Sequence, residues 1–241
     1  MSATAVAGVS GTLGASYAND STGSPNLDMW NIDGSLTWSS PTWGVEAAGG
    51  YHNISPGSLD IWNIGGSVFW NWPSVGRLAG TVNYDDLGSG GLKFTSYGAG
   101  LDWWVNSNVT VDVKGGGTNI DFGCSGCNVN GGYVGGMLKY YALGGNLALS
   151  GTVDYFSVTG GNETDETLRA EYLWSPTFPM SVYGGYQHQD GNLFFGGTSQ
   201  DIFFVGLKFY FNGAGAASLE DRQRNGSLGY ISQNTMFWNQ Y

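Results

Sequence analysis

The fold is decided by the stretch Asp28-Met29-Trp30-Asn31-Ile32-Asp33-Gly34-Ser35-Leu36-Thr37-Trp38. Its residues alternate with a period of two, which predicts a β-strand with one apolar and one polar face. The apolar face carries Trp30, Ile32, Gly34, Leu36 and Trp38, and the other carries Met29, Asn31, Asp33, Ser35 and Thr37.

The same stretch is repeated further along the chain. Residues 27–35, Leu-Asp-Met-Trp-Asn-Ile-Asp-Gly-Ser, return as residues 59–67, Leu-Asp-Ile-Trp-Asn-Ile-Gly-Gly-Ser, after a shift of 32 positions. A shift of this length corresponds to two strands with their turn and loop, so the repeating unit is a β-hairpin. Propeller blades and solenoid turns can have similar periods, but the later hairpins keep no blade signature.

Extending the period-2 analysis outward predicts twelve strands, near residues 6–17, 28–38, 43–52, 60–70, 77–84, 93–105, 109–116, 129–141, 146–158, 167–174, 180–188 and 200–211. Short connectors alternate with longer ones that are rich in Gly, Ser, Asn and Asp, at 18–27, 53–59, 85–92, 117–128, 159–166 and 189–199. All six prolines fall in connectors, as expected where strands need every backbone donor.

Composition excludes several classes of protein. The 241 residues include 42 glycines, which argues against helices, and 41% hydrophobic residues, which argues against disorder. The net charge of −11 leaves no basic stripe for nucleic acid. No apolar run reaches the length of a transmembrane helix. The N-terminus has no signal-peptide pattern, so we expect a mature chain whose leader is absent.

The tryptophans distinguish a membrane barrel from a soluble sandwich. Most of them lie near strand ends, at Trp30, Trp38, Trp43, Trp62, Trp70, Trp103 and Trp174. The eight residues from Trp30 to Trp38 span about 26 Å along a strand, or roughly 20 Å of height in a tilted one. This height is close to the ~25 Å band between the aromatic girdles of outer-membrane barrels. The pattern therefore favours an all-β, single antiparallel transmembrane β-barrel of about 12 strands. A secreted β-sandwich that binds carbohydrate through exposed tryptophans is an alternative.

The last predicted strand, residues 200–211, carries the most specific resemblance. Gly206, Phe209 and Phe211 stand where a barrel-assembly signal has its glycine, alternate hydrophobic and terminal aromatic residue. On these features, residues 6–211 resemble the bacterial outer-membrane β-barrel (porin-like) superfamily, in particular a small alphaproteobacterial branch of it. Phe204 departs from the usual polar residue, and about 30 residues follow Phe211, whereas the family often ends there.

The resemblance implies a location and partners. We expect residues 1–211 to form the barrel in the outer membrane of a Gram-negative bacterium, with short periplasmic turns and longer external loops. We expect residues 212–241 to form a C-terminal periplasmic tail, in which Ser218 can cap a short helix to about Arg224 that Gly226 stops. The expected partners are outer-membrane lipids and lipopolysaccharide, the barrel-assembly machinery during biogenesis, and a homo-oligomer or an assembly partner through the tail.

Strand phase places a set of charged residues inside the barrel, as candidates to line a pore: Asp33, Glu46, Arg77, Asp102, Asp112, Lys114, Lys139, Asp154, Arg169, Glu171 and Lys208. Small inward residues such as Ser10 and Gly98 favour an open lumen. We therefore expect a porin-like channel for passive diffusion of small hydrophilic solutes or ions. The alternative is a structural barrel with a plugged interior that binds lipopolysaccharide or a protein assembly through its loops or tail.

The remaining chemical motifs are weak. Cys124 and Cys127 lie in the longest predicted loop, where a small disulfide is favoured over half a metal or redox site. His52 is inward by phase and His188 ends a strand, and neither has a serine and an acid placed by a motif. We expect no enzyme activity, no cofactor and no metal.

Overall fold

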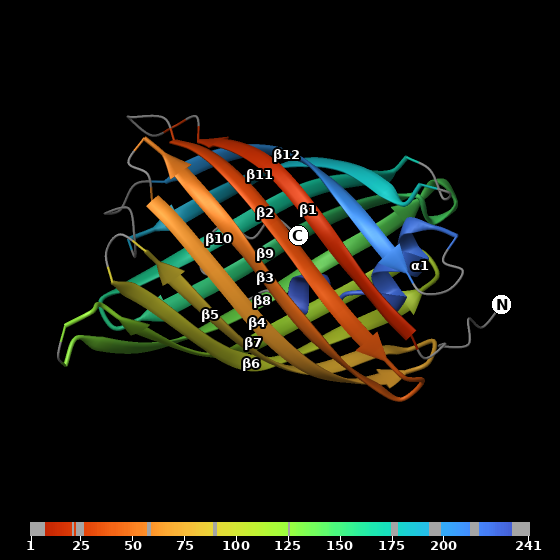
Figure 1. Cartoon of the computed structure of the whole chain (residues 1–241), viewed down its shortest axis with the longest axis horizontal. Helices are drawn as coiled ribbons and strands as arrows, with labels where there is room; N and C mark the ends of the chain where they lie inside the picture. The colour runs from red at the N-terminus through yellow and green to blue at the C-terminus, as the bar shows by residue number, and fades with distance from the viewer. Residues whose placement is uncertain are drawn as a thin grey trace.

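The computed structural model describes residues 8–20, 22, 27–56, 59–88, 91–124, 126–174, 178–192, 199–212 and 217–232. Within them twelve long strands wind around a common axis (Figure 1). The strands are β1 Gly8–Asp20, β2 Leu27–Ser39, β3 Trp43–Ser55, β4 Leu59–Trp72, β5 Gly76–Leu87, β6 Leu92–Asn106, β7 Val109–Asp121, β8 Asn128–Ala142, β9 Leu147–Val158, β10 Gly161–Leu173, β11 Met180–Gly191 and β12 Gln200–Asn212. A 3₁₀ turn at Leu143–Gly145 (η1) connects β8 to β9, and the helix α1 (Leu219–Asn225) and a 3₁₀ turn at Gly229–Ile231 (η2) follow β12.

The sheet closes on itself. Each strand pairs antiparallel with its neighbours in the chain, and β1 pairs with β12 along a register that runs from Ser10 opposite Asn212 to Asp20 opposite Ile202. Closure leaves no strand edge with unpaired backbone groups, which is a requirement for a sheet in lipid. The predicted twelve-stranded barrel is confirmed, and the alternative of a two-sheet sandwich is wrong because the described strands form one closed barrel.

The strands are longer than predicted at the end where the long loops were expected. β5 continues to Leu87, β7 to Asp121 and β11 to Gly191, while β10 already begins at Gly161. The expected loop at 159–166 is therefore a tight turn, in which Gly160 adopts a φ of +100°. The prediction stopped short because outward residues such as Asn119 are polar there, although inward residues such as Ile120 remain buried. At the start of β1, residues 6 and 7 lie outside the described residues.

The outer wall is apolar and the inner wall is largely polar. On β2 the outward side chains of Trp30, Ile32 and Leu36 are 62%, 55% and 59% exposed, whereas the inward Asn31 and Thr37 are buried. All seven tryptophans predicted for the girdles are exposed. This inverted pattern is expected of a barrel whose outside contacts lipid. None of the described helices is long and apolar enough to cross a membrane.

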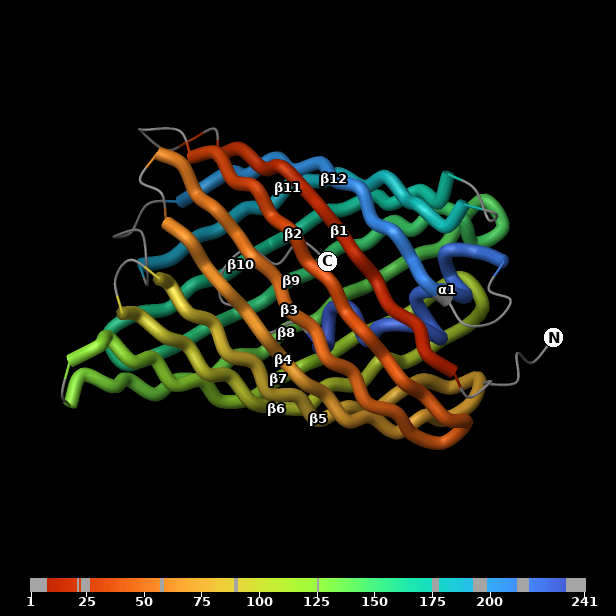
Figure 2. The backbone as a smooth tube through the Cα atoms, in the orientation of Figure 1, coloured from red at the N-terminus to blue at the C-terminus, as the bar shows by residue number. Residues whose placement is uncertain are grey.

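The interior is layered. Toward the long-loop end, inward apolar side chains from many strands form one buried cluster: Ala18, Met29, Ile54, Ile61, Leu87, Phe94, Ile120, Tyr133, Phe156, Tyr183, Ile202 and Phe204. The inward charges that the sequence predicted occupy the middle and the short-turn end. At the short-turn end the chain that follows β12 turns back into the barrel, where α1 and η2 are seen inside the wall (Figures 1 and 2).

The last strand is shaped by close packing across the wall. A Cβ at Gly206 would collide with the ring of Tyr183 on β11 and come within 2.7 Å of the Ala15 carbonyl oxygen on β1. The inward Phe204, which departs from the assembly-signal pattern, stacks near Tyr183 with ring centroids 6.3 Å apart. Gly206 is thus required by packing, and its part in assembly, with Phe209 and Phe211, stays a prediction.

Candidate functional site: the barrel lumen

The charged side chains predicted to face inward do lie on the lumenal face. Nine of the eleven are buried, and Asp33 and Lys139 are partly exposed. Strand register brings several of them together, since Arg77 is opposite Asp102, and Asp102 is opposite Asp112 on the next strand. The structure therefore confirms their orientation, and their role in lining a pore remains a prediction.

The short-turn end of the lumen is occupied by residues 217–232, named the lumenal segment below. Its helix α1 has the predicted N-terminus: the Ser218 hydroxyl accepts from the Asp221 backbone, and the Asp221 carboxylate accepts from the Ser218 backbone. Leu219 at the start of the helix is fully buried against Tyr141 and Tyr210 of the wall. Over these residues, the predicted C-terminal tail lies in the interior of the barrel.

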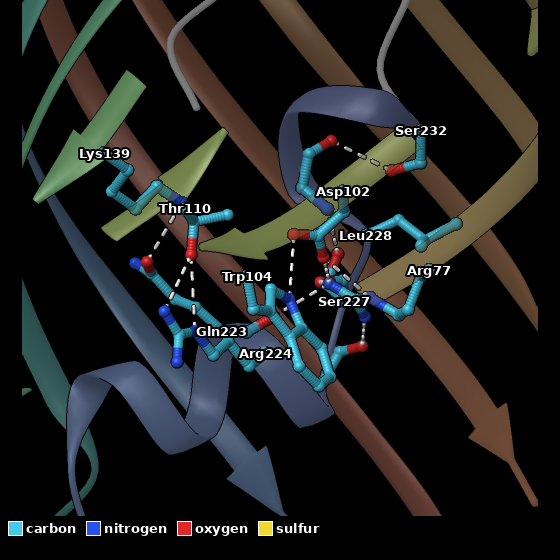
Figure 3. Close-up of polar contacts among 12 residues, drawn as sticks. Arg77, Asp102, Trp104, Thr110, Lys139, Gln223, Arg224, Ser227, Leu228 and Ser232 are labelled. Atoms are coloured by element: carbon cyan, nitrogen blue, oxygen red, sulfur yellow. Dashed lines mark hydrogen bonds and ion pairs between the residues drawn. The ribbon is translucent and has the colours of Figure 1, made fainter. Parts of the chain in front are cut away.

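Arg77 of the wall contacts the lumenal segment through three carbonyl groups (Figure 3). Its guanidinium pairs with Asp102, at 2.7 Å between Nη2 and Oδ2, and donates to the carbonyl oxygens of Gln223, Gly226 and Ser227. These carbonyls lie at the end of α1, where four carbonyl groups lack helical partners. Arg77 therefore satisfies both a buried carboxylate and the C-terminus of the helix.

Asp102 receives a further bond from the wall itself. The Nε1 of Trp104 donates to Asp102 Oδ1 at 2.9 Å, so Trp104 faces the lumen while the adjacent Trp103 is exposed on the outer wall. The guanidinium of Arg224 lies 5.7 Å from the Trp104 ring centroid. Trp104 thus belongs to the lumenal site and not to a girdle.

Gln223 joins four wall groups. Its Oε1 accepts from the Lys139 ammonium at 3.1 Å and from the Tyr141 hydroxyl at 3.0 Å. Its Nε2 donates to Glu171 and to the Tyr210 hydroxyl, each at 3.2 Å. The neutral amide of Gln223 therefore bridges the Lys139 ammonium and the Glu171 carboxylate. These bonds hold the helix between β8 on one side and β10 and β12 on the other.

The end of the lumenal segment is held by a second group of contacts. Glu46 Oε2 accepts from the Leu228 backbone at 2.8 Å, and the Tyr230 hydroxyl donates to Asp154 at 2.7 Å. The Lys114 ammonium lies 4.0 Å from the Tyr230 ring centroid. Burial, followed by the Asp154 charge, raises the pKa of Tyr230, so its hydroxyl stays protonated and able to donate.

Inward glycines make room for the lumenal segment. A Cβ at Gly100 on β6 would come within 2.5 Å of Ile231 Cγ2. A Cβ at Gly135 on β8 would collide with Asp154 and the Tyr230 hydroxyl. The sequence alone predicts that small inward residues favour an open lumen, but Gly100 and Gly135 make room for side chains of the segment.

A cavity of about 70 Å³ remains between the lumenal segment and the wall. Six of the eight basic residues of the chain line it, together with only three carboxylates, Asp102, Asp112 and Glu171. The six are Arg77, Lys139, Arg169, Lys208, Arg222 and Arg224. The chain as a whole is strongly acidic, yet most of its basic residues lie around this one cavity.

Four further buried carboxylates face the lumen and were not anticipated: Asp20, Asp85, Glu163 and Asp165. They lie where strands β1, β5 and β10 continue past the predicted ends. Extending the alternation from Arg169 back through Thr167 to Asp165 would have found the last of them.

The histidines and cysteines have local partners. His52 is buried between the side chains of Asn31 and Asn63, and His188 contacts Asp201 at 2.8 Å. Cys124 and Cys127 are joined in a disulfide. The part of the chain that the structure describes has no group of three or more His, Cys, Asp or Glu side chains placed to hold a metal ion.

The fold is similar to that of solved outer-membrane porins and channels. The KdgM porin superimposes with a TM-score of 0.60 at 10% identity, over 83% of this chain and 99% of the porin. The NanC porin superimposes with a TM-score of 0.67 at 12% identity, over 82% of this chain and 98% of the porin. The COG4313 outer membrane channel from Pseudomonas putida F1 superimposes with a TM-score of 0.57 at 12% identity, over 87% of this chain and 97% of the channel.

These similarities show a shared fold. No protein-family profile matches the sequence, and a comparison with curated proteins found no match.

Proposed function

We propose that the protein is a porin-like channel in the outer membrane of a Gram-negative bacterium, for passive diffusion of small hydrophilic solutes or ions. One observation carries the proposal: a closed twelve-stranded wall that is apolar outside and charged inside. An interior of this kind is typical of barrels that conduct water-soluble solutes. The porins and the channel that share the fold support it.

The orientation follows from the connectors. In outer-membrane barrels short turns face the periplasm and longer loops face outward, so the lumenal segment enters from the periplasmic side. Lipids and lipopolysaccharide would contact the outer wall, and the assembly machinery would recognise β12. The alphaproteobacterial origin and an oligomer through the tail are inferences from the sequence alone.

A second candidate function is favoured by the lumenal segment. The lumenal segment makes many contacts with the wall, and an apolar cluster fills the lumen near the long loops. A barrel filled in this way can be a structural protein that interacts through its loops. Twelve strands are intermediate between barrels filled by side chains and barrels with an aqueous channel, so the strand number does not separate the two functions.

Single-channel conductance in planar bilayers separates them. We expect the folded full-length protein to give small steps, and a chain truncated after Asn212 to give steps roughly twofold larger or more, because removing the segment widens the lumen. Heat-modifiable migration in gels controls for folding. Steps from the truncated chain alone would favour the filled barrel, and no steps from either chain would contradict the channel.

A further inference from the structure

The cavity beside the lumenal segment has more positive charge than its own carboxylates can neutralise. Of its three carboxylates, Asp102 is committed to Arg77. Glu171 accepts from Arg169, Ser181, Tyr210 and Gln223. The basic residues that border the same space outnumber these acids two to one.

Two of the basic residues lie close to the same aromatic ring. The Arg169 guanidinium carbon lies 4.0 Å from the centroid of the Tyr183 ring, and the Lys208 ammonium lies 5.6 Å from it. Both side chains are at least nine-tenths buried. Like charges in a poorly hydrated site repel strongly, and each ring face compensates only a fraction of that cost.

The hydrogen-bonding capacity of these cations is largely unused. Arg169 donates from Nη2 to Glu171 at 2.7 Å, but its Nε and Nη1 are buried without an acceptor. The Lys208 ammonium has no hydrogen bond or ion pair with any residue that the structure describes, although Asp33 and Glu171 lie near enough to influence it. Lys139 adds a further positive charge on that side.

A hydroxyl group completes the arrangement. Thr167 lies two residues before Arg169 on β10, on the same inward face, and its buried Oγ1 lacks a partner. Buried polar groups are normally hydrogen-bonded, so three unsatisfied donors around one cavity indicate a missing acceptor. A water needs only roughly 10–15 Å³, so about 70 Å³ accommodates a small oxyanion with some waters.

We propose that this cavity binds a small oxyanion between Arg169 and Lys208, with Thr167 as a further donor. Carboxylates and phosphate share the required chemistry, since both present several acceptor oxygens to charged donors. The site deepens the proposed function, because solutes that carry such a group would pause there on their way through the lumen.

Binding is measured by calorimetry on the folded full-length protein in detergent micelles. Inorganic phosphate and gluconate serve as separate probes, so the two arms identify which oxyanion is preferred. We expect saturable binding of at least one probe, weakened by a factor of about ten in Arg169→Gln and in Lys208→Gln, which is what one lost charged hydrogen bond amounts to. Lys93→Gln, which removes an exposed charge from β6, is the matched control and should bind as the parent does.

Two results would overturn the site: neither probe binds the parent protein, or Lys93→Gln weakens binding as much as the two lumenal variants. Gel mobility before and after heating shows whether each variant is folded, and either lumenal variant suffices. If the parent binds a probe, Arg169→Gln loses that binding and the parent gives no conductance, the site is supported and the channel is contradicted. If the parent conducts but binds neither phosphate nor gluconate, the channel is supported and the site is contradicted.

Discussion

Arg77 and Asp102 form a buried ion pair that connects the barrel wall to the chain inside it. The pair alone joins β5 to β6, but the remaining guanidinium donors end on carbonyl groups of Gln223, Gly226 and Ser227. Losing Arg77 would therefore leave the buried Asp102 carboxylate without its cationic partner and three carbonyl groups without this donor.

The first prediction concerns this pair. Arg77→Gln should leave the barrel intact but release the lumenal segment, since breaking one side of a buried pair costs about 3–5 kcal/mol. Limited trypsin digestion measures the release, because Arg222 and Arg224 are cleavage sites within the segment. We expect rapid cleavage at both sites in the variant, and protection in the parent and in Lys93→Gln. Equal protection of all three proteins would show that Arg77 does not hold the segment.

The second prediction tests the glycine contact beneath η2. Gly100→Val places a side chain where Ile231 now lies, and should displace the end of the segment and raise conductance. Gly80→Ala is the matched control, since its added methyl group meets nothing closer than 4.0 Å on the outer wall. Unchanged conductance in Gly100→Val would indicate that η2 does not narrow the path.

The third prediction concerns the lipid-facing wall. Leu13 on β1 is 52% exposed and lies opposite Gly34 on β2. Gly34 is midway along β2 between Trp30 and Trp38. Leu13→Arg should lower the free energy of unfolding in lipid vesicles by about 2–4 kcal/mol, whereas an arginine near an interface costs about 0–1 kcal/mol. Leu143→Arg, in the exposed turn η1, supplies that comparison in guanidinium titrations. Equal losses in the two variants would place the membrane band elsewhere.

The fourth prediction concerns the disulfide. Because Cys124 and Cys127 close a loop of only four residues, the chain-entropy estimate limits its contribution to about 2 kcal/mol. Replacing both cysteines by serine should leave conductance and gel mobility unchanged. Mass spectrometry after alkylation, with and without reductant, verifies the bond in the parent protein. A large loss of folded barrel in the double variant would contradict this local role.

The strands could be predicted from the sequence because the side chains of each strand alternate between two different environments. On β2 the alternation of Trp30, Ile32 and Leu36 with Asn31 and Thr37 marks lipid on one side and the lumen on the other. Where strands extend beyond the lipid the outward residues become polar, as at Asn119, and the alternation that defines the strand is lost. The ends of β5, β7 and β10 were therefore missed.

The lumenal segment shows a different limit. The helix itself was predicted, because Ser218 and Gly226 are local signals for its start and end. Its place was not, since it depends on pairs distant in sequence, such as Arg77 and Gly226, which are separated by 149 positions. Small inward residues favoured an open pore, but the same residues also make room for a filled interior, and the residues that occupy the space are not marked in the sequence.

The position of the lumenal segment directly after β12 determines the order in which the molecule is assembled. β12 is the strand that closes the wall on β1. The segment contacts side chains from β3 to β10 and from β12, so its binding surface is complete only once most of the sheet exists. We therefore expect filling of the interior to be the last event of folding, and we expect that the segment can leave again while the backbone hydrogen bonds of the wall stay in place.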